Sequence, residues 1–328
     1  MKLTVLTEYS SQIGFGHISR TLAIADCFFE IGWEVEYLIR ELEKNDIAIS
    51  YPYQLVEWSE TSLVKNILEN SDAVLIDSYR VSPATLSELA ENISFPLTII
   101  DSKLNYPDCG VLIFGSIYAD KFEVKGDFTV LSGKDYFLFR KDFINAKKDF
   151  ILREELRKIV ITLGKFVKSS DIATILSVIN KTLNHLVEIY VVGTPIENIE
   201  QNEYIQYCPF LETKKYVELL QTADLVITNG GQTLNESIAL NIPTLAIEIA
   251  DNQSENILGW NNLGVILALG KISDANFHSN LEEGLLRMMN LNERRLYSDR
   301  SKEMIDLNGA QRILKYVLEK LEKNRSCP

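Results

Sequence analysis

The chain has 328 residues, of which 46% are hydrophobic and 24% charged, proportions typical of a soluble globular protein of about two domains. The net charge of −13 argues against nucleic acid as a partner, since binding a phosphate backbone needs clustered Lys and Arg. Four scattered cysteines and three histidines lack metal-ligand spacing, so we expect no metal site, and free thiols suit a reducing cytoplasm. We also expect no cofactor. We expect no signal peptide and no integral membrane segment, because no apolar run approaches the ~20 residues of a membrane span. Composition leaves the oligomeric state open.

Strand-like and helix-like patterns alternate through the first half of the chain. The predicted strands are Leu3–Thr7, Val35–Ile39, Ala73–Ile76, Leu97–Ile100 and Val111–Phe114, and the predicted helices are His17–Glu30, Thr61–Glu69 and Pro83–Asn92. Apolar strands between amphipathic helices indicate a parallel sheet that is covered on both faces.

The second half repeats this alternation. The predicted strands are Ile159–Leu163, Val187–Val192, Leu225–Thr228 and Thr244–Ile247; the predicted helices are Ser170–Leu183, Lys214–Thr222, Thr233–Leu240, Asn256–Leu263, Leu281–Met289, Glu293–Asp306 and Ala310–Glu322. The charged segment Lys141–Arg157 separates the halves, so we divide the chain near Lys147 into domains 1–147 and 148–328, from which the last helix could return to the first domain. Two doubly wound α/β domains predict ligands at the carboxyl ends of their strands, in an interdomain cleft.

A glycine turn with a histidine follows the first predicted strand: Gly14-Phe15-Gly16-His17-Ile18-Ser19-Arg20. It is not a dinucleotide fingerprint, because Ser19 stands where the third glycine of G-x-G-x-x-G would be. His17 follows the second glycine directly, at the mouth of a strand-to-helix turn, where we expect an exposed imidazole. A lone histidine is more often structural than catalytic. In this position, however, an imidazole that titrates near neutral pH is a good general base.

A second glycine turn, Asn229-Gly230-Gly231-Gln232-Thr233, follows a hydrophobic strand and opens a helix. Glycines let the backbone approach a phosphate, and the free N–H groups and positive dipole end of the helix then hold it. Glu236 lies one helical turn further on, where a carboxylate could reach a ribose diol. The alternative is an ordinary strand-to-helix turn that uses glycine only for tight geometry.

Together these motifs resemble the GT-B superfamily, and more closely the family of the UDP-sugar hydrolase of pseudaminic acid biosynthesis and related spore-coat polysaccharide proteins. The resemblance covers roughly residues 1–270 and rests on Gly14–Arg20, Leu75–Tyr79, Ile99–Asp101 with Pro107–Cys109, Leu131–Phe143, and Asn229–Glu236 with Ala250–Gln253. It implies two Rossmann-like domains and displacement chemistry at a UDP-sugar without a metal. We expect hydrolysis of a UDP-linked amino-deoxy sugar to the free sugar and UDP. The alternatives are a glycosyltransferase with a hydroxyl acceptor and a nucleotide-sugar-binding protein without catalysis.

The resemblance places the catalytic side chains on the first domain. His17 would deprotonate water, or an acceptor hydroxyl in a transferase. Asp77 and Tyr79 end a strand on the same side, and Asp77 could orient His17, hold a sugar hydroxyl or hydrogen-bond local backbone. Arg20 lies three residues after His17 on the same helix face and could contact a phosphate or pair with an acidic neighbour.

The resemblance places the nucleotide on the second domain. Backbone N–H groups around Gly231, Gln232 and Thr233 would bind the diphosphate, and Glu236 would accept from the ribose hydroxyls. Asn252 and Gln253 would bind the sugar or diphosphate, unless they are a helix cap and a surface residue. The chain departs from the family at Gly164-Lys165, where two glycines are usual; Lys165 could supply a charge to a phosphate or block close approach. The predicted binding residues are thus Gly14, Gly16, Arg20, Gly164, Lys165, Asn229, Gly230, Gly231, Gln232, Thr233, Glu236, Asn252 and Gln253.

Overall fold

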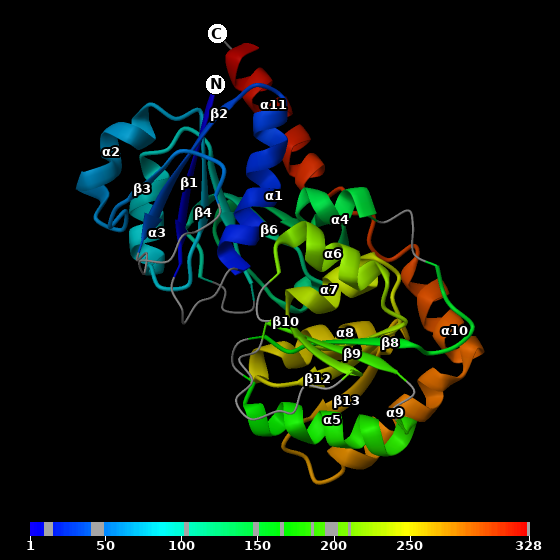
Figure 1. The fold of residues 1–328 in the computed structure, drawn as a ribbon. Coiled ribbons are helices and arrows are strands. Elements are labelled where there is room, and N and C mark those ends of the chain that lie inside the picture. Colours follow the sequence, from blue (N-terminus) through cyan, green and yellow to red (C-terminus); the bar gives the residue numbers. More distant parts are fainter. Residues whose placement is uncertain are drawn as a thin grey trace. The chain divides into compact units, whose positions relative to one another are not determined.

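The computed structural model describes residues 1–9, 16–40, 49–101, 105–146, 151–164, 167–184, 187–193, 203–208 and 211–326, with side chains to residue 323. The chain forms two compact units (Figure 1). Unit 1 comprises Met1–Lys141 and Leu307–Pro328, and unit 2 comprises Asp142–Asp306. None of the helices within the described ranges is long and apolar enough to cross a membrane.

Unit 1 is built on a seven-stranded parallel sheet with the strand order β3-β2-β1-β4-β5-β6-β7. Its strands are β1 (Lys2–Glu8), β2 (Glu34–Arg40), β3 (Tyr53–Leu55), β4 (Ala73–Asp77), β5 (Pro96–Ile99), β6 (Cys109–Phe114) and β7 (Asp127–Ser132). Its helices are α1 (Gly16–Glu30), α2 (Thr61–Glu69), α3 (Pro83–Glu91), α11 (Gly309–Ser326) and the short 3-10 helices η1 (Ala119–Lys121) and η2 (Lys134–Tyr136).

Alternate residues of the strands in unit 1 build separate cores on the two faces of the sheet. Leu3 and Val5 of β1 face a core that includes α1 and α11, whereas Leu6 faces a core shared with α2 and α3. This alternation follows from the two-residue period of a strand, and burial on both faces explains why the strands are almost continuously hydrophobic.

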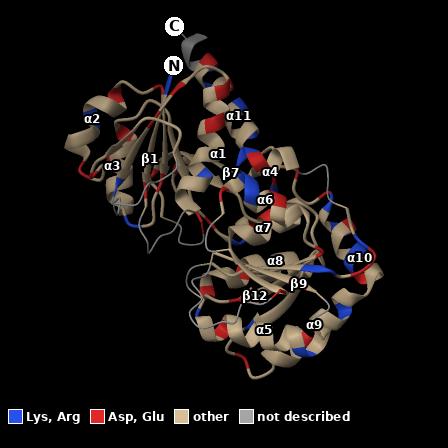
Figure 2. Cartoon of the chain, viewed as in Figure 1, with Lys and Arg blue, Asp and Glu red and all other residues tan. Residues whose placement is uncertain are grey.

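The last helix belongs to unit 1, the return that was considered for it, so the second domain ends at Asp306 and not at residue 328. Ala310, Ile313 and Val317 are spaced along one stripe of α11 and are buried in the same core as Phe28 of α1. This apolar stripe is the physical reason for the return. Figure 2 shows acidic and basic residues interspersed along α11, as expected of a helix whose other face meets solvent. The units divide after Lys141, and the predicted boundary residue Lys147 lies outside the described ranges.

Unit 2 contains a six-stranded parallel sheet with the order β10-β9-β8-β11-β12-β13. Its strands are β8 (Lys158–Thr162), β9 (Glu188–Val192), β10 (Ile205–Cys208), β11 (Leu225–Asn229), β12 (Thr244–Glu248) and β13 (Leu267–Lys271). Its helices are α5 (Ser169–Leu183), α6 (Thr213–Gln221), α7 (Gln232–Ala239), η4 (Asp251–Gln253), α8 (Ser254–Asn262), α9 (Phe277–Met289) and α10 (Leu291–Ser301), and α4 (Lys141–Ala146) precedes the sheet. One core of this unit joins the sheet to α5 and α9.

Each sheet reverses its strand order at one point, and such a switch point is the usual ligand site of a doubly wound sheet. In unit 1 the reversal lies between β1 and β4, and in unit 2 it lies between β8 and β11. The carboxyl ends of these strand pairs carry the predicted catalytic and nucleotide-binding residues respectively. The expectation that both face one interdomain cleft stays a prediction.

Candidate functional site

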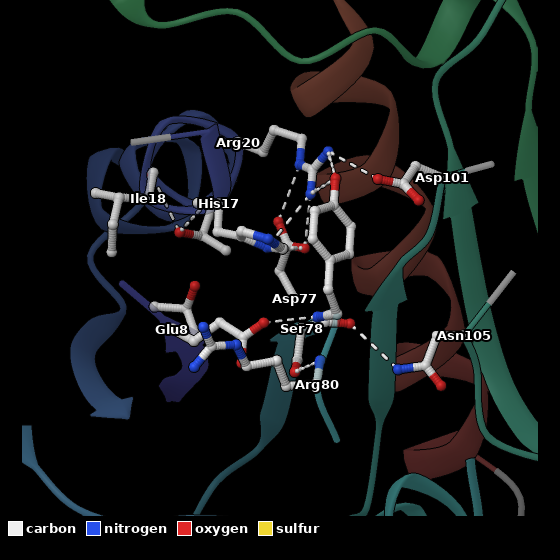
Figure 3. Close-up of polar contacts among 12 residues, drawn as sticks. Glu8, His17, Ile18, Arg20, Asp77, Ser78, Arg80, Asp101 and Asn105 are labelled. Carbon is white, nitrogen blue, oxygen red and sulfur yellow. Dashed lines mark hydrogen bonds and ion pairs between the residues drawn. The ribbon is translucent and has the colours of Figure 1, made fainter. Parts of the chain in front are cut away.

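Five polar or aromatic side chains converge at the switch point of unit 1 (Figure 3). Glu8 is the last residue of β1, Asp77 is the last residue of β4, and Tyr79 lies in the turn after β4. His17 and Arg20 come from the first turns of α1. Because β1 and β4 are neighbouring parallel strands with Thr7 opposite Asp77, their carboxyl ends bring these groups to one edge of the sheet.

His17 and Asp77 form a buried pair. The Nδ1 atom of His17 lies 2.6 Å from Oδ1 of Asp77, and each residue is only 1% exposed. The prediction of an exposed imidazole is therefore wrong: α1 begins at Gly16, so its first turn packs His17 against the end of β4. An ionised carboxylate only accepts hydrogen bonds, so Nδ1 donates and Nε2 of a neutral ring carries the lone pair. Nε2 is buried and has no hydrogen-bond partner within the described residues.

Arg20 keeps Asp77 in its charged form. Nε of Arg20 donates to Oδ2 of Asp77 at 3.0 Å and Nη2 donates to Oδ1 at 2.9 Å, a two-pronged contact between guanidinium and carboxylate. Burial alone would raise the pKa of Asp77, but the charge of Arg20 and the hydrogen bonds from His17 and Arg20 hold it below its ordinary value. Arg20 also pairs with Asp101, with Nη1 3.8 Å from Oδ2. Two roles were considered for Arg20, contact with a phosphate and pairing with an acidic neighbour. The contacts with Asp77 and Asp101 correspond to the second role.

Tyr79 forms one wall of the site. Its ring meets the imidazole of His17 edge to face, with ring centroids 4.2 Å apart, and its hydroxyl accepts from Arg20 at 3.4 Å. Burial raises the pKa of the Tyr79 phenol, so the hydroxyl is neutral at physiological pH. These contacts suit a residue that orients the imidazole.

Glu8 is a site residue that the sequence analysis missed. Its carboxylate is fully buried, and Oε1 accepts a hydrogen bond from the backbone N–H of Tyr79 at 2.7 Å. A signal was present, because a charged residue directly follows the hydrophobic run Leu3–Thr7 at the carboxyl end of a central strand. Gly16 is exposed at the start of α1, and Gly14 lies outside the described residues.

The switch point of unit 2 is organised around Asn229, the last residue of β11. Oδ1 of Asn229 accepts from the backbone N–H of Gly231 at 3.0 Å, and Nδ2 donates to the carbonyl of Leu163 at 2.8 Å. Gly164 follows with a φ of +77°, the left-handed region that favours glycine. Asn229 thus ties the turn before α7 to the end of β8, while Lys165 lies outside the described residues.

Gly230 is required by packing. A Cβ atom at this position would lie 2.7 Å from Cβ of Gln253 and 2.7 Å from Cγ1 of Ile257. The turn therefore runs directly against η4 and α8. Gly231 is the N-cap of α7. A Cβ atom added to Gly231 would meet only Oδ1 of Asn229 at 3.0 Å and Cγ of Asn229 at 3.9 Å.

Buried amides behind the turn fix its position. Asn235 accepts hydrogen bonds from Nε1 of Trp260 at 2.9 Å and from Asn256 at 3.3 Å, and Asn256 also donates to the carbonyl of Gly230 at 2.9 Å. Asn235, Asn256 and Trp260 were not predicted from the sequence. Glu236, on the same helix, is only 4% exposed.

The remaining predicted binding residues lie at the amino ends of helices. Gln232 and Thr233 open α7 and are half-buried, and the hydroxyl of Thr233 accepts from Tyr216 at 3.4 Å. Oε1 of Gln253 accepts from the backbone N–H groups of Ile249 and Ala250, so the capping contacts belong to Gln253, whereas the alternative drawn from the sequence had Asn252 as the cap and Gln253 as a surface residue. Asn252 is exposed in η4. Within the described ranges, no group of three or more His, Cys, Asp or Glu residues could hold a metal ion.

No family model matches the chain, but its sequence resembles curated proteins. It is 23% identical over 275 residues to the UDP-2,4-diacetamido-2,4,6-trideoxy-beta-L-altropyranose hydrolase of Campylobacter jejuni, covering 79% of this chain and 96% of that protein. It is 22% identical over 291 residues to the spore coat polysaccharide biosynthesis protein SpsG of Bacillus subtilis, covering 82% and 84%. An uncharacterized protein of Methanocaldococcus jannaschii, MJ1062, is 24% identical over 283 residues, which span 78% of this chain and 57% of that protein. The resemblance drawn from the motifs is confirmed.

Solved structures with the same architecture cover nearly the whole chain. MurG of Acinetobacter baumannii has a TM-score of 0.65 at 13% identity and covers 97% of this chain and 100% of its own. MnaA of Staphylococcus aureus, solved with UDP, has a TM-score of 0.64 at 11% identity and covers 98% and 97%. The spinosyn rhamnosyltransferase SpnG, complexed with thymidine diphosphate, has a TM-score of 0.62 at 13% identity and covers 96% and 100%. The chain has the two-domain GT-B fold, as predicted.

Proposed function

We propose that this GT-B protein is an enzyme that hydrolyses a UDP-linked amino-deoxy sugar to the free sugar and UDP, in nonulosonic acid (pseudaminic-type) or surface polysaccharide biosynthesis. The observation that carries the proposal is the buried His17–Asp77 pair, in which Nε2 of His17 has no partner among the described residues. A histidine held in this way is a general base poised for an incoming proton. The likeness to the Campylobacter jejuni hydrolase supports water as the source of that proton.

In the proposed reaction, Nε2 of His17 takes a proton from a water molecule. The water oxygen bonds to the sugar carbon as the bond to UDP breaks, and UDP leaves with the electron pair. The imidazole becomes an imidazolium, and the charge of Asp77 stabilises it across the 2.6 Å contact. Arg20 keeps Asp77 ionised, so the carboxylate holds the Nδ1 proton in place rather than acting as the base.

The nucleotide is assigned to the switch point of unit 2. The free N–H groups at the start of α7, from Gly231 to Thr233, and the positive end of the helix dipole would hold the diphosphate. Glu236, one turn further on, would accept from the ribose hydroxyls. Asn252 would meet the sugar or diphosphate from η4. The capping bonds of Gln253 support a positioning role for that residue.

A glycosyltransferase is the second candidate, and the likeness to the rhamnosyltransferase SpnG favours it. The same base would then remove the proton of an acceptor hydroxyl. A nucleotide-sugar-binding protein without catalysis would use the unit 2 site alone, and the organised His17–Asp77 pair in unit 1 speaks against that reading.

One incubation separates the three candidates. The protein is mixed with a panel of UDP-linked amino-deoxy sugars without any acceptor, and UDP release is followed over time. Release at enzymatic rates, abolished in His17→Asn, supports the hydrolase. Release only after an acceptor alcohol is added supports the transferase, and binding without turnover in either condition supports the non-catalytic protein.

A further inference from the structure

One carboxylate oxygen of Glu8 has no hydrogen-bond partner among the residues that the structure describes. The side chain is fully buried, and Oε1 is taken by the backbone N–H of Tyr79 at 2.7 Å. Oε2 is also buried and has no hydrogen-bond partner within the described residues. A buried acceptor left without a donor destabilises the folded state, and more so when it is charged, so an unused one points to a group that arrives from outside.

The unpartnered oxygen lies in the same cluster as the proposed base. Figure 3 shows Glu8, the last residue of β1, and His17, in the first turn of α1, beside Asp77 and Ser78. Glu8 holds the backbone of Tyr79, and the ring of Tyr79 meets the imidazole of His17 at 4.2 Å. Two buried atoms of this one cluster, Oε2 of Glu8 and Nε2 of His17, thus lack a partner in the described part of the chain.

We infer that Glu8 is a substrate-binding residue whose Oε2 accepts a hydrogen bond from a hydroxyl or amide N–H of the sugar, an inference that rests on the proposed function. It would bind the sugar beside the base while Oε1 continues to hold Tyr79. The predicted binding set thereby gains a residue on unit 1.

The local charges select the class of ligand. Glu8, Asp77 and Asp101 contribute three carboxylates to the cluster, and the guanidinium of Arg20 is bound to Asp77 and Asp101. Figure 3 also shows the side chain of Arg80 on the Glu8 side of the cluster, and with Arg80 included the carboxylates still outnumber the guanidinium groups. A phosphate brings negative charge and offers mainly acceptors, so it does not fit against Oε2 of Glu8. A sugar hydroxyl or an acetamido N–H is neutral and donates. The site in unit 1 is thus suited to the sugar end of the substrate.

The variant Glu8→Gln tests this inference because it has the same shape but only one acceptor oxygen. That oxygen can accept from Tyr79 or from the ligand, while the amide nitrogen now donates where an acceptor was needed. The matched control is Glu36→Gln, which removes a carboxylate that contacts Lys2 and Thr4 near the opposite ends of the strands in the same sheet.

Calorimetry is performed with UDP alone and with the UDP-sugar that the wild-type protein hydrolyses or binds. We expect Glu8→Gln to bind UDP as the wild type does but to bind the UDP-sugar on the order of tenfold more weakly, the loss of one charge-assisted hydrogen bond. Glu36→Gln should bind both ligands normally. Equal affinity of Glu8→Gln and wild type for the UDP-sugar overturns the inference and leaves the proposed function intact. A wild-type protein that binds no UDP-sugar ends the proposed function, and the role of Glu8 ends with it.

A measurement on the wild-type protein covers the case in which Glu8→Gln does not fold. Carbon-13 labelling of glutamate side chains gives separate signals for the buried Glu8 and Glu236, the latter assigned from Glu236→Gln. UDP should perturb only the Glu236 signal, and the UDP-sugar should perturb a second buried carboxylate as well. A spectrum in which the sugar perturbs no further buried signal overturns the inference.

Discussion

Asp77, at the end of β4, holds Nδ1 of His17 at 2.6 Å although 60 residues separate them in the chain. The parallel pairing of β1 with β4 makes this contact possible, because α1 begins soon after β1 and its first turn reaches the end of the neighbouring strand. The carboxylate determines which imidazole nitrogen carries the proton, and Arg20 determines that the carboxylate is charged. A short chain of contacts therefore links sheet topology to the imidazole nitrogen that carries the proton in the proposed base.

Replacing His17 should remove catalysis and leave nucleotide binding intact. His17→Asn lacks a group that can take a proton near neutral pH, so turnover of the UDP-sugar should fall by about 10²–10⁴. UDP affinity should barely change, because the proposed nucleotide site is on unit 2. Steady-state kinetics and UDP calorimetry check both parts. Near-normal turnover would return His17 to a structural role and make Asp77 the next candidate base.

Replacing Asp77 should affect both activity and stability. Asp77→Asn keeps the shape but loses the charge that stabilises the imidazolium, so kcat should fall at least tenfold with KM little changed. It also leaves Arg20 without its buried partner, and the free energy of unfolding should fall by on the order of 3 kcal/mol, moderated by the remaining Asp101. Urea unfolding measures the second effect, and His17→Asn, which leaves the ion pair with Arg20, is its control. An unchanged kcat would mean that Asp77 only anchors Arg20.

The same ion pair predicts how stability depends on pH. The pKa of Asp77 is lower in the folded protein than in the unfolded chain, where it is about 3.9. A lowered pKa contributes stability that is fully present above the unfolded value and is lost as pH falls through the folded value. The free energy of unfolding should therefore fall as the pH is lowered from about 5. Asp77→Asn should show a shallower decline, and parallel curves for the two proteins would contradict the assignment.

The interior of the fold could be predicted from the sequence, and its edges could not. Within the described residues, the four strands that were not predicted are β3, β7, β10 and β13, which are the edge strands of the two sheets. A central strand is buried on both faces and reads as a hydrophobic run, whereas an edge strand is partly exposed and tolerates polar residues. All three residues of Tyr53–Leu55 in β3 are exposed, so burial imposes little pattern there.

In the candidate site, residues that belong to short sequence motifs could be predicted, whereas contacts between segments far apart in the chain could not. His17 and the glycine turns could be recognised because they belong to short motifs, and Asp77 because it ends a hydrophobic run. The burial of His17, the hydrogen bond from Tyr79 to Glu8 and the amides behind Gly230 depend on segments that meet only in the folded chain. Motif spacing carries no information about such contacts.

Gly230 and Gly231 should respond differently to alanine. In Gly230→Ala the new Cβ would lie 2.7 Å from atoms of Gln253 and Ile257, so the turn must move away from α8. Overpacking of this kind costs about 1–3 kcal/mol and should also weaken UDP binding through the displaced start of α7. Gly231→Ala, the comparison, meets Oδ1 of Asn229 at 3.0 Å and should cost less. Equal stability of the two variants would show that Gly230 is not required by packing.

Glu236 provides the sharpest test of the nucleotide site. It is 4% exposed on α7, so an alanine there would leave a cavity, and Glu236→Gln is the cleaner change because it keeps the volume. If the carboxylate accepts from the ribose hydroxyls, losing that charge should weaken UDP binding by about 1–3 kcal/mol, and Glu236→Ala should weaken it at least as much. Uracil alone, which has no ribose, should bind wild type and Glu236→Gln equally.

Asn235→Ala is the structural comparison for Glu236→Gln. It breaks the hydrogen bonds to Trp260 and Asn256, so it should lower the melting temperature more than Glu236→Gln does. If both Glu236→Gln and Glu236→Ala fold and bind UDP with full affinity, Glu236 is not part of the nucleotide site. The proposed site would then consist of the amino end of α7 without this carboxylate.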